Sequence, residues 1–256
     1  MRPRVLLLGG LDPSGGAGLT VDATVVALHG GMPLPVAVVL TAQSGQGFVA
    51  AEAVPAATWQ RALAAVGSDG PFAAIKLGLL ADPALAPLLA AALHEPLRAG
   101  APLVLDPVLS ATAGGFASPA ALVEAYRRHL LPLATLVTPN LPELQALADG
   151  DPTRLLAAGA RAVLVKGGHG DGDHAVDVLW QAGSQQRFVR PRWPVGRVRG
   201  TGCTLGSAIA ARLARGEDLK TAVAGAGDWL AAILATMPPV TAAAPVRPLP
   251  LAAVRP

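Results

Sequence analysis

Residues 5–28 read VLLLGGLDPSGGAGLTVDATVVAL, and this stretch decides the fold class. A glycine-rich turn joins a short apolar run to an apolar segment with helical spacing. An unbroken apolar run, rather than an alternating one, is typical of a strand that is covered on both faces. The stretch therefore predicts a strand, a turn and a helix, which form the first half of a parallel βαβ unit.

The same alternation recurs along the chain. Further apolar runs start about 30 residues apart, which suits βαβ units with right-handed crossovers, at residues 35–40, 73–77, 103–105, 136–138 and 162–165. Segments with helical spacing lie at residues 18–28, 56–66, 83–93, 119–130, 141–148 and 202–214. We therefore predict an α/β protein with a mostly parallel central sheet.

The composition favours one large core. The chain has 256 residues, of which 52% are hydrophobic and 14% are charged. A chain of this length can bury about three quarters of its unfolded surface around one core. We expect a single domain over residues 1–256, with residues 238–256 as a proline- and alanine-rich tail that runs irregularly over the surface.

Charge and apolar patterning exclude several classes of partner. The net charge is only +3, and the arginines are scattered without interleaved aromatic residues, so no nucleic-acid binding is expected. Glycine and proline interrupt the uncharged segment 23–51, which leaves no apolar stretch long enough to span a membrane. The apolar run near Met1 is too short for a signal peptide, and Cys203 is the only cysteine, so we expect a cytoplasmic protein.

Residues 199–209 read RGTGCTLGSAI and begin a predicted helix. Gly200 and Gly202 allow close approach of the backbone, and the free N–H groups of a helix N-terminus can bind a phosphate or a developing anion. A tight loop that binds no ligand fits the spacing equally well. Cys203 lies in the first turn, where the helix dipole lowers the pKa of a thiol, but a lone cysteine is more often a small buried hydrophobe.

Residues 12–18 form a second glycine-rich turn. It is no Walker A loop, because no Gly-Lys-Ser/Thr sequence follows. Close approach to a small ligand and a plain turn from strand to helix are equally compatible with the sequence. Asp22 lies one turn into the apolar segment that follows, where a carboxylate requires a partner or a ligand hydroxyl.

Other polar residues stand where predicted strands end. Asn140 and Glu143 could hold a hydrated Mg²⁺ ion, but their spacing is also that of a capping box, which the residues by themselves favour. Asp106 is a second candidate for contact with a metal or water. Lys166 is a candidate phosphate ligand, because an unpaired lysine on a buried strand is costly. Lys76 poses the same question, and the sequence assigns it no role.

Seven segments in order resemble the hydroxymethylpyrimidine/phosphomethylpyrimidine kinases of thiamine biosynthesis, in the ribokinase-like superfamily. The segments read GLDPSGGAG (10–18), TAQ (41–43), KLG (76–78), DPV (106–108), VTPNLPE (137–143), VKGGH (165–169) and GTGCTL (200–205). The resemblance implies a three-layer αβα sandwich that forms a homodimer. It also implies phosphorylation by ATP and Mg²⁺ of 4-amino-5-hydroxymethyl-2-methylpyrimidine, and then of its monophosphate.

The resemblance also implies roles for individual residues. The pyrimidine would contact Gly10, Asp22, Gln43, Leu79 and Val108, and the amide of Gln43 matches the amino-pyrimidine edge. ATP would contact Asn140, Glu143, Lys166 and Thr201. The metal would contact Glu143 and Asp106. This assignment sets the capping interpretation of Asn140 and Glu143 aside. The catalytic set would be Gly200, Thr201, Gly202 and Cys203, in which Cys203 stands where most ribokinase-like enzymes have an aspartate.

Several positions depart from the family pattern. Leu11 stands in place of the usual Ser, Leu79 in place of Met, and Arg197-Val198-Arg199 in place of Asn-Thr-His. Residues 110–114 lack the usual lysine, and residues 242–246 lack the usual glycines. Two alternatives therefore stay open: a pyridoxal-type kinase, because pyridoxal also carries a CH₂OH group on a heteroaromatic ring, and a pyrimidine-binding sensor module without catalysis.

Overall fold

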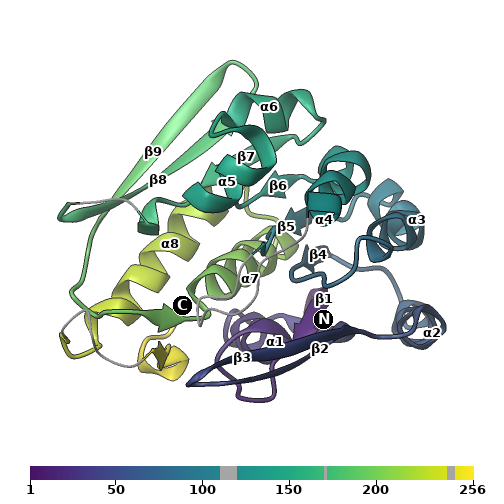
Figure 1. The fold of residues 1–256 in the computed structure, drawn as a ribbon, viewed down its shortest axis with the longest axis horizontal. Coiled ribbons are helices and arrows are strands. Elements are labelled where there is room, and N and C mark those ends of the chain that lie inside the picture. Colours follow the sequence, from purple (N-terminus) through teal and green to yellow (C-terminus); the bar gives the residue numbers. More distant parts are fainter. Residues whose placement is uncertain (110–119, 170–171, 241–245) are drawn as a thin grey trace.

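The computed structural model describes residues 1–109, 120–169, 172–240 and 246–256. Among them, nine strands form one sheet in the order β3-β2-β1-β4-β5-β6-β7-β8-β9 (Figure 1). The strands are β1 (Arg4–Leu11), β2 (Met32–Ser44), β3 (Gly47–Ala53), β4 (Ala74–Leu77), β5 (Leu103–Leu105), β6 (Leu136–Val137), β7 (Ala162–Val165), β8 (His174–Gln181) and β9 (Ser184–Pro191). The six strands from β2 to β7 along this order pair in parallel, whereas β3, β8 and β9 pair antiparallel with their neighbours.

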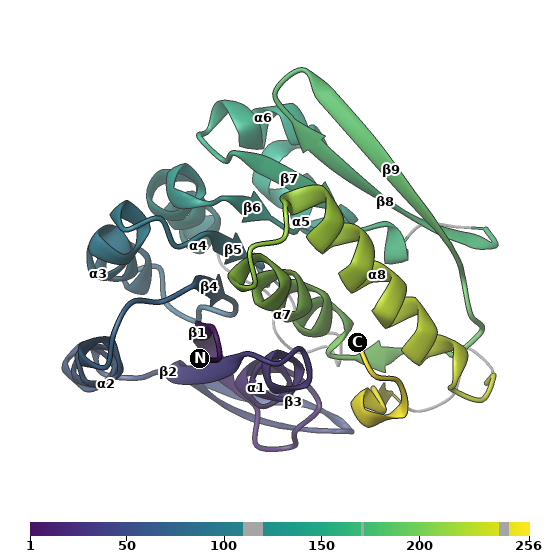
Figure 2. The ribbon, with the colours of Figure 1, turned by 180° about the vertical axis from the view of Figure 1, so that it is seen from behind.

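Helices cover both faces of the sheet. On one face lie α1 (Gly18–Leu28), α7 (Thr201–Ala214) and α8 (Leu219–Ala235), which Figure 2 shows in front of the strands. On the other face lie α2 (Ala56–Ser68), α3 (Leu85–Arg98), α4 (Ala120–Ala125), α5 (Leu141–Ala148) and α6 (Pro152–Ala157). Alternate strand residues belong to the two cores: Leu6 and Leu8 pack on one face, and Val5 and Leu7 on the other. The predicted three-layer αβα sandwich is thus confirmed.

All six apolar runs form strands, and α1 and α5 have the predicted bounds. Of the predicted helix over residues 119–130, the described part from residue 120 is only partly regular α-helix, because α4 is followed by a π-helical turn at Tyr126–Leu130 and a 3₁₀ turn at Leu131–Leu133. The sequence pattern did not predict the β2–β3 and β8–β9 hairpins or the helices α6 and α8. The two hairpins lie at the edges of the sheet. In β9 the exposed polar residues Ser184, Gln185 and Arg187 break up the apolar run that marks a central strand, whereas β3 is a short, mostly exposed strand of small and apolar residues.

Helix α8 was not predicted from the sequence, although it has 17 residues. It contains Gly225 and Gly227, which lower helix propensity. The structure shows why glycine stands there: a Cβ atom on Gly227 would overlap the guanidinium group of Arg190, and one on Gly225 would overlap that of Arg212. Two arginine side chains from neighbouring elements therefore lie directly on the backbone of α8.

The described part of the C-terminal tail contains two short regular elements. Arg247–Pro248 forms β11, which pairs in parallel with β10 (Val198–Arg199) just before α7. A 3₁₀ turn follows at Leu251–Ala253, and the indole N–H of Trp229 donates to the carbonyl of Val254 at 3.0 Å. Among the described residues, no helix is long and apolar enough to cross a membrane.

The exit from β7 depends on a glycine that allows close packing. A Cβ atom at Gly167 would overlap the backbone carbonyl of Val176 in β8, whereas one at Gly168 would meet no atom within 4 Å. We expect Gly167→Ala to lower the free energy of unfolding by about 1–3 kcal/mol through overpacking, and Gly168→Ala to lower it by clearly less. Urea denaturation of both variants measures this, and equal losses would contradict the structure.

Candidate active site

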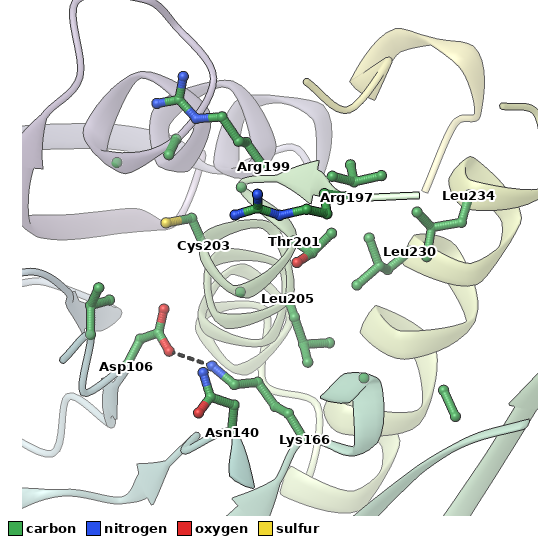
Figure 3. Close-up of a pocket in the computed structure, with 18 of the residues that line it drawn as sticks. Asp106, Asn140, Lys166, Arg197, Arg199, Thr201, Cys203, Leu205, Leu230 and Leu234 are labelled. Carbon is green, nitrogen blue, oxygen red and sulfur yellow. Dashed lines mark hydrogen bonds and ion pairs between the residues drawn. The ribbon is translucent and has the colours of Figure 1, made fainter. Parts of the chain in front are cut away.

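The N-terminus of α7 opens into a cavity of about 720 Å³ (Figure 3). Gly200 precedes the helix with a φ angle of +79°, and a Cβ atom there would lie 2.5 Å from the carbonyl oxygen of Gly16. No side chain of the described residues caps this helix end. Since Gly200, Thr201, Gly202 and Cys203 all line the cavity, the N–H groups of the first turn are placed to bind an anion. The structure therefore favours the anion-binding interpretation over a closed loop.

The thiol of Cys203 is harder to ionise than its place on the helix suggested. Burial raises its pKa to about 11. The ammonium group of Lys76 and the N–H group of Gly18 lower it only in part, and the carboxylates of Asp22 and Asp106 raise it further. Of the two interpretations that the sequence left open, the structure agrees with the small buried side chain and not with a thiol whose pKa is lowered, because burial and two nearby carboxylates raise this pKa. Cys203 is a neutral thiol at pH 7.

The buried charges of Asp22 and Lys76 compensate each other in an ion pair. The two side chains are both 1% exposed and form an ion pair at 2.8 Å, and the hydroxyl of Ser207 donates to the other carboxylate oxygen of Asp22 at 2.8 Å. Burial raises the pKa of Asp22, and Lys76 opposes this shift. The network joins α1, β4 and α7, and both charged residues line the cavity. Both buried charges were predicted from the sequence, but their pairing was not, although each needed a partner of opposite sign.

Lys166 contacts two carboxylates beside the α7 N-terminus. Its Nζ atom lies 2.7 Å from Oδ1 of Asp106 and 3.7 Å from Oε2 of Glu143 (Figure 3). Burial would raise the pKa of Asp106, but Lys166 and Lys76 outweigh it and hold this pKa below its ordinary value. Burial raises the pKa of Glu143 to about 7 despite the attraction of Lys166. The strand ends of β5, β6 and β7 thus bring together the predicted Asp106, Glu143 and Lys166.

Asn140 and Glu143 form a complete capping box at the start of α5. The backbone N–H of Glu143 donates to Oδ1 of Asn140, and the backbone N–H of Asn140 donates to Oε2 of Glu143, both at 2.8 Å. Setting the capping interpretation aside was therefore wrong. The cap and a ligand-binding role are compatible, because both residues also line the cavity and keep polar atoms beyond these two bonds.

The predicted acceptor residues gather at one end of the same cavity. Gly10, Asp22, Gln43, Leu79 and Val108 all line it. A Cβ atom on Gly10 would lie 3.0 Å from the side chain of Leu79, so glycine keeps this end open. The departures at residues 110–114 and 242–245 lie outside the described residues. The other end of the cavity is lined by apolar and basic residues that sequence analysis did not assign: Arg190, Arg192, Trp193, Val195, Arg197, Leu230 and Leu234.

A family model described as phosphomethylpyrimidine kinase matches residues 12–247. The chain belongs to the phosphomethylpyrimidine kinase family. The hydroxymethylpyrimidine/phosphomethylpyrimidine kinase of Escherichia coli K12 is 35% identical over 246 residues, which are 91% of each chain. The thiamine biosynthesis bifunctional protein ThiED of Geobacter sulfurreducens is 37% identical over 249 residues, 93% of this chain and 50% of that protein, so the chain spans about half the length of this relative.

Among solved structures, an ADP complex of Bacillus subtilis pyridoxal kinase is similar with a TM-score of 0.84. It is 26% identical and the match covers 95% of this chain and 98% of that chain. This similarity and the topology of the sheet confirm the ribokinase-like fold that the resemblance implied.

The raised pKa of Glu143 predicts a pH-dependent stability of the ligand-free protein. Between its ordinary pKa of 4.5 and the folded-state value of about 7, the folded chain keeps a proton that the unfolded chain releases. Stability therefore falls as the pH rises through this window, by roughly 3 kcal/mol in total. In Glu143→Gln this component is absent, because the amide does not titrate but its oxygen can still accept from Asn140.

The measurement is urea denaturation of both proteins from pH 4 to pH 8 in the presence of EDTA. The difference in unfolding free energy between them should change mainly between pH 4.5 and 7. Parallel curves across this range would contradict the raised pKa.

Proposed function

We propose that the protein is an ATP-dependent kinase that phosphorylates the CH₂OH group of 4-amino-5-hydroxymethyl-2-methylpyrimidine, and then the resulting monophosphate, in thiamine biosynthesis. One observation carries this proposal: residues suited to a heteroaromatic alcohol and residues suited to phosphates line one cavity together with an uncapped helix N-terminus. Membership of a kinase family supports ATP as the phosphoryl donor.

The acceptor would lie between β1, β2 and the N-terminus of α7. Gly10, Leu79 and Val108 supply a narrow apolar surface for a flat ring. The amide of Gln43 has the paired donor and acceptor that an amino-pyrimidine edge requires. Asp22 is held by Lys76 and Ser207, so it would border the ring with its charge already compensated.

The phosphates of ATP would lie against Lys166, Thr201 and Asn140. Glu143 and Asp106 would hold a hydrated Mg²⁺ ion, whose role is to neutralise phosphate charge. The donor set fits this ion, because Mg²⁺ keeps several waters and needs few protein ligands. The two buried carboxylates, which both contact the ammonium group of Lys166, supply these few ligands. The described residues contain no cluster of three candidate metal ligands, which an ion bound mainly by protein groups would require.

In the reaction, the acceptor oxygen forms a bond to the γ-phosphorus atom, the bond to ADP breaks, and the hydroxyl proton is released. Phosphoryl transfer through a loose transition state depends mainly on alignment and charge stabilisation. The N–H groups of residues 200–203 would receive the charge of the transferring group. Since its pKa is raised to about 11, the Cys203 thiol would align the attacking hydroxyl through a hydrogen bond rather than act as a strong base.

A pyridoxal-type kinase is the second candidate, and the similarity to Bacillus subtilis pyridoxal kinase favours it. Sequence identity of 35% to the pyrimidine kinase of E. coli favours the first. A sensor module without catalysis is the third, and the presence of Asn140, Glu143, Lys166 and Cys203 around one cavity speaks against it. The homodimer, the cytoplasmic location and the single domain over residues 1–256 stay predictions.

Incubation of the purified protein with Mg-ATP and one acceptor at a time tests the function. We expect mass spectrometry to show the monophosphate of the hydroxymethylpyrimidine, and the diphosphate when the monophosphate is supplied. The kcat/KM value for the pyrimidine alcohol should exceed that for pyridoxal. A higher value for pyridoxal would favour the second candidate, and no product from either alcohol would contradict catalysis.

Replacement of the thiol tests the role of Cys203. Cys203→Ala should lower kcat by about 10²-fold, because the attacking hydroxyl loses its hydrogen-bond partner, while the dissociation constant for ATP changes little. Cys203→Ser restores a neutral donor and acceptor of similar size, so it should recover much of the loss. Steady-state kinetics and calorimetric titration with ATP measure both quantities. Turnover of Cys203→Ala equal to that of the wild type would refute the assignment.

A further inference from the structure

Arg199 connects two segments beside the proposed acceptor site, residues 12–14 after β1 and residues 43–44 at the end of β2. Its Nη2 atom donates to Oδ2 of Asp12 and to Oε1 of Gln43, both at 2.8 Å. Its Nη1 atom donates to the carbonyl of Ser44 at 2.6 Å and to the hydroxyl of Ser14 at 3.2 Å. The side chain is only 4% exposed, and its guanidinium carbon would lie 3.3 Å from a Cβ atom on Gly16. The rigid planar fork of arginine is thus held in one orientation.

The contacts of Gln43 fix which way its amide faces. The hydroxyl of Thr41 donates to the carbonyl of Leu11 at 2.9 Å, so it must accept from Nε2 of Gln43, which lies 2.9 Å away. Arginine has only donors, so the atom of Gln43 that meets Arg199 must be the oxygen. A flipped amide would place N–H groups against N–H groups and would lose both bonds. The order of donor and acceptor on this side chain is therefore set by Arg199 and Thr41 together.

We propose that Arg199 is a specificity-determining positioning residue, which fixes the order in which Gln43 presents its remaining N–H group and oxygen lone pair to the acceptor ring. This inference rests on the proposed function and deepens it. An amino-pyrimidine has an amino donor next to a ring-nitrogen acceptor. The matching 4-oxo-pyrimidine has a carbonyl acceptor next to a ring N–H donor, which is the reverse order. A fixed amide distinguishes these two edges, whereas an amide free to flip can pair with either.

The test compares two acceptors that differ only in this edge: 4-amino-5-hydroxymethyl-2-methylpyrimidine and its 4-oxo counterpart. The measured quantity is the ratio of their kcat/KM values. This ratio does not depend on how much of a preparation is folded, because both acceptors are assayed with the same protein. We expect the wild type to prefer the amino compound by at least about 10²-fold, since the wrong edge leaves polar groups unpaired.

Arg199→Met should reduce this ratio at least about ten-fold, because only Thr41 then restrains the amide, and its hydroxyl can rotate to donate to a flipped Gln43 oxygen. Arg127→Met is the matched control. Arg127 also holds backbone carbonyls, those of Ala146 and Leu147 at the end of α5, but it does not line the cavity. Its replacement should leave the ratio unchanged.

Because Arg199→Met leaves the carboxylate of Asp12 without its cation, the double variant Arg199→Met/Asp12→Asn is assayed in parallel, and we expect the same fall in the ratio.

A Gln43→Met background tests whether Arg199 acts through Gln43. In that background the ratio should already be low, and adding Arg199→Met should not change it further. An unchanged ratio in Arg199→Met and in the double variant with Asp12→Asn, with both kcat/KM values lowered equally, would overturn this inference and leave the proposed function intact. Failure of the wild type to phosphorylate either pyrimidine would overturn the proposed function, and this inference with it.

Discussion

The structure depends on the packing of the first turns of α7 against two ion pairs, which lie one helical turn apart along the face that carries Gly202 and Gly206. A buried ammonium group is costly unless a carboxylate compensates it, so Lys76 requires Asp22, and Lys166 requires Asp106. Small residues of α7 make room for both pairs: a Cβ atom on Gly202 would lie 3.3 Å from Nζ of Lys166, and one on Gly206 would lie 3.8 Å from Cε of Lys76. The helix can therefore approach the strand ends closely enough to direct its first N–H groups into the cavity.

The same arrangement suits a site that receives phosphates. In the ligand-free protein, the cations beside the helix N-terminus already have carboxylate partners, so the site can stay folded without substrate. In the proposed reaction, the phosphates of ATP would become anionic partners of Lys166 while the metal takes up the carboxylates, so that no charge in the site would be left uncompensated. The neutral thiol of Cys203 adds no further negative charge where a phosphoryl group would pass. The electrostatics thus favour anion binding and alignment over proton abstraction.

Much of this could be predicted from the sequence, because unbroken apolar runs mark central parallel strands and polar residues mark their ends. The six central strands followed from the first signal, and Asp106, Asn140 and Lys166 followed from the second. The pyrimidine contacts came only from the family resemblance, and the residues from Arg190 to Arg197 that line the cavity were not assigned. What could not be predicted depends on contacts between distant segments. The glycines of α8 obscured a helix because they accommodate arginines from elsewhere in the chain, and the pairing of Lys76 with Asp22 spans 54 positions. The pKa of Cys203 depends on burial, which a helix position alone does not reveal.

A crystal structure with a non-hydrolysable ATP analogue and the hydroxymethylpyrimidine tests the central claim most directly. We expect oxygens of the terminal phosphate to lie within about 3.2 Å of the backbone nitrogens of residues 201–203. The acceptor hydroxyl should lie between that phosphate and the sulfur of Cys203. A terminal phosphate bound elsewhere, with those N–H groups in contact with water alone, would contradict the account.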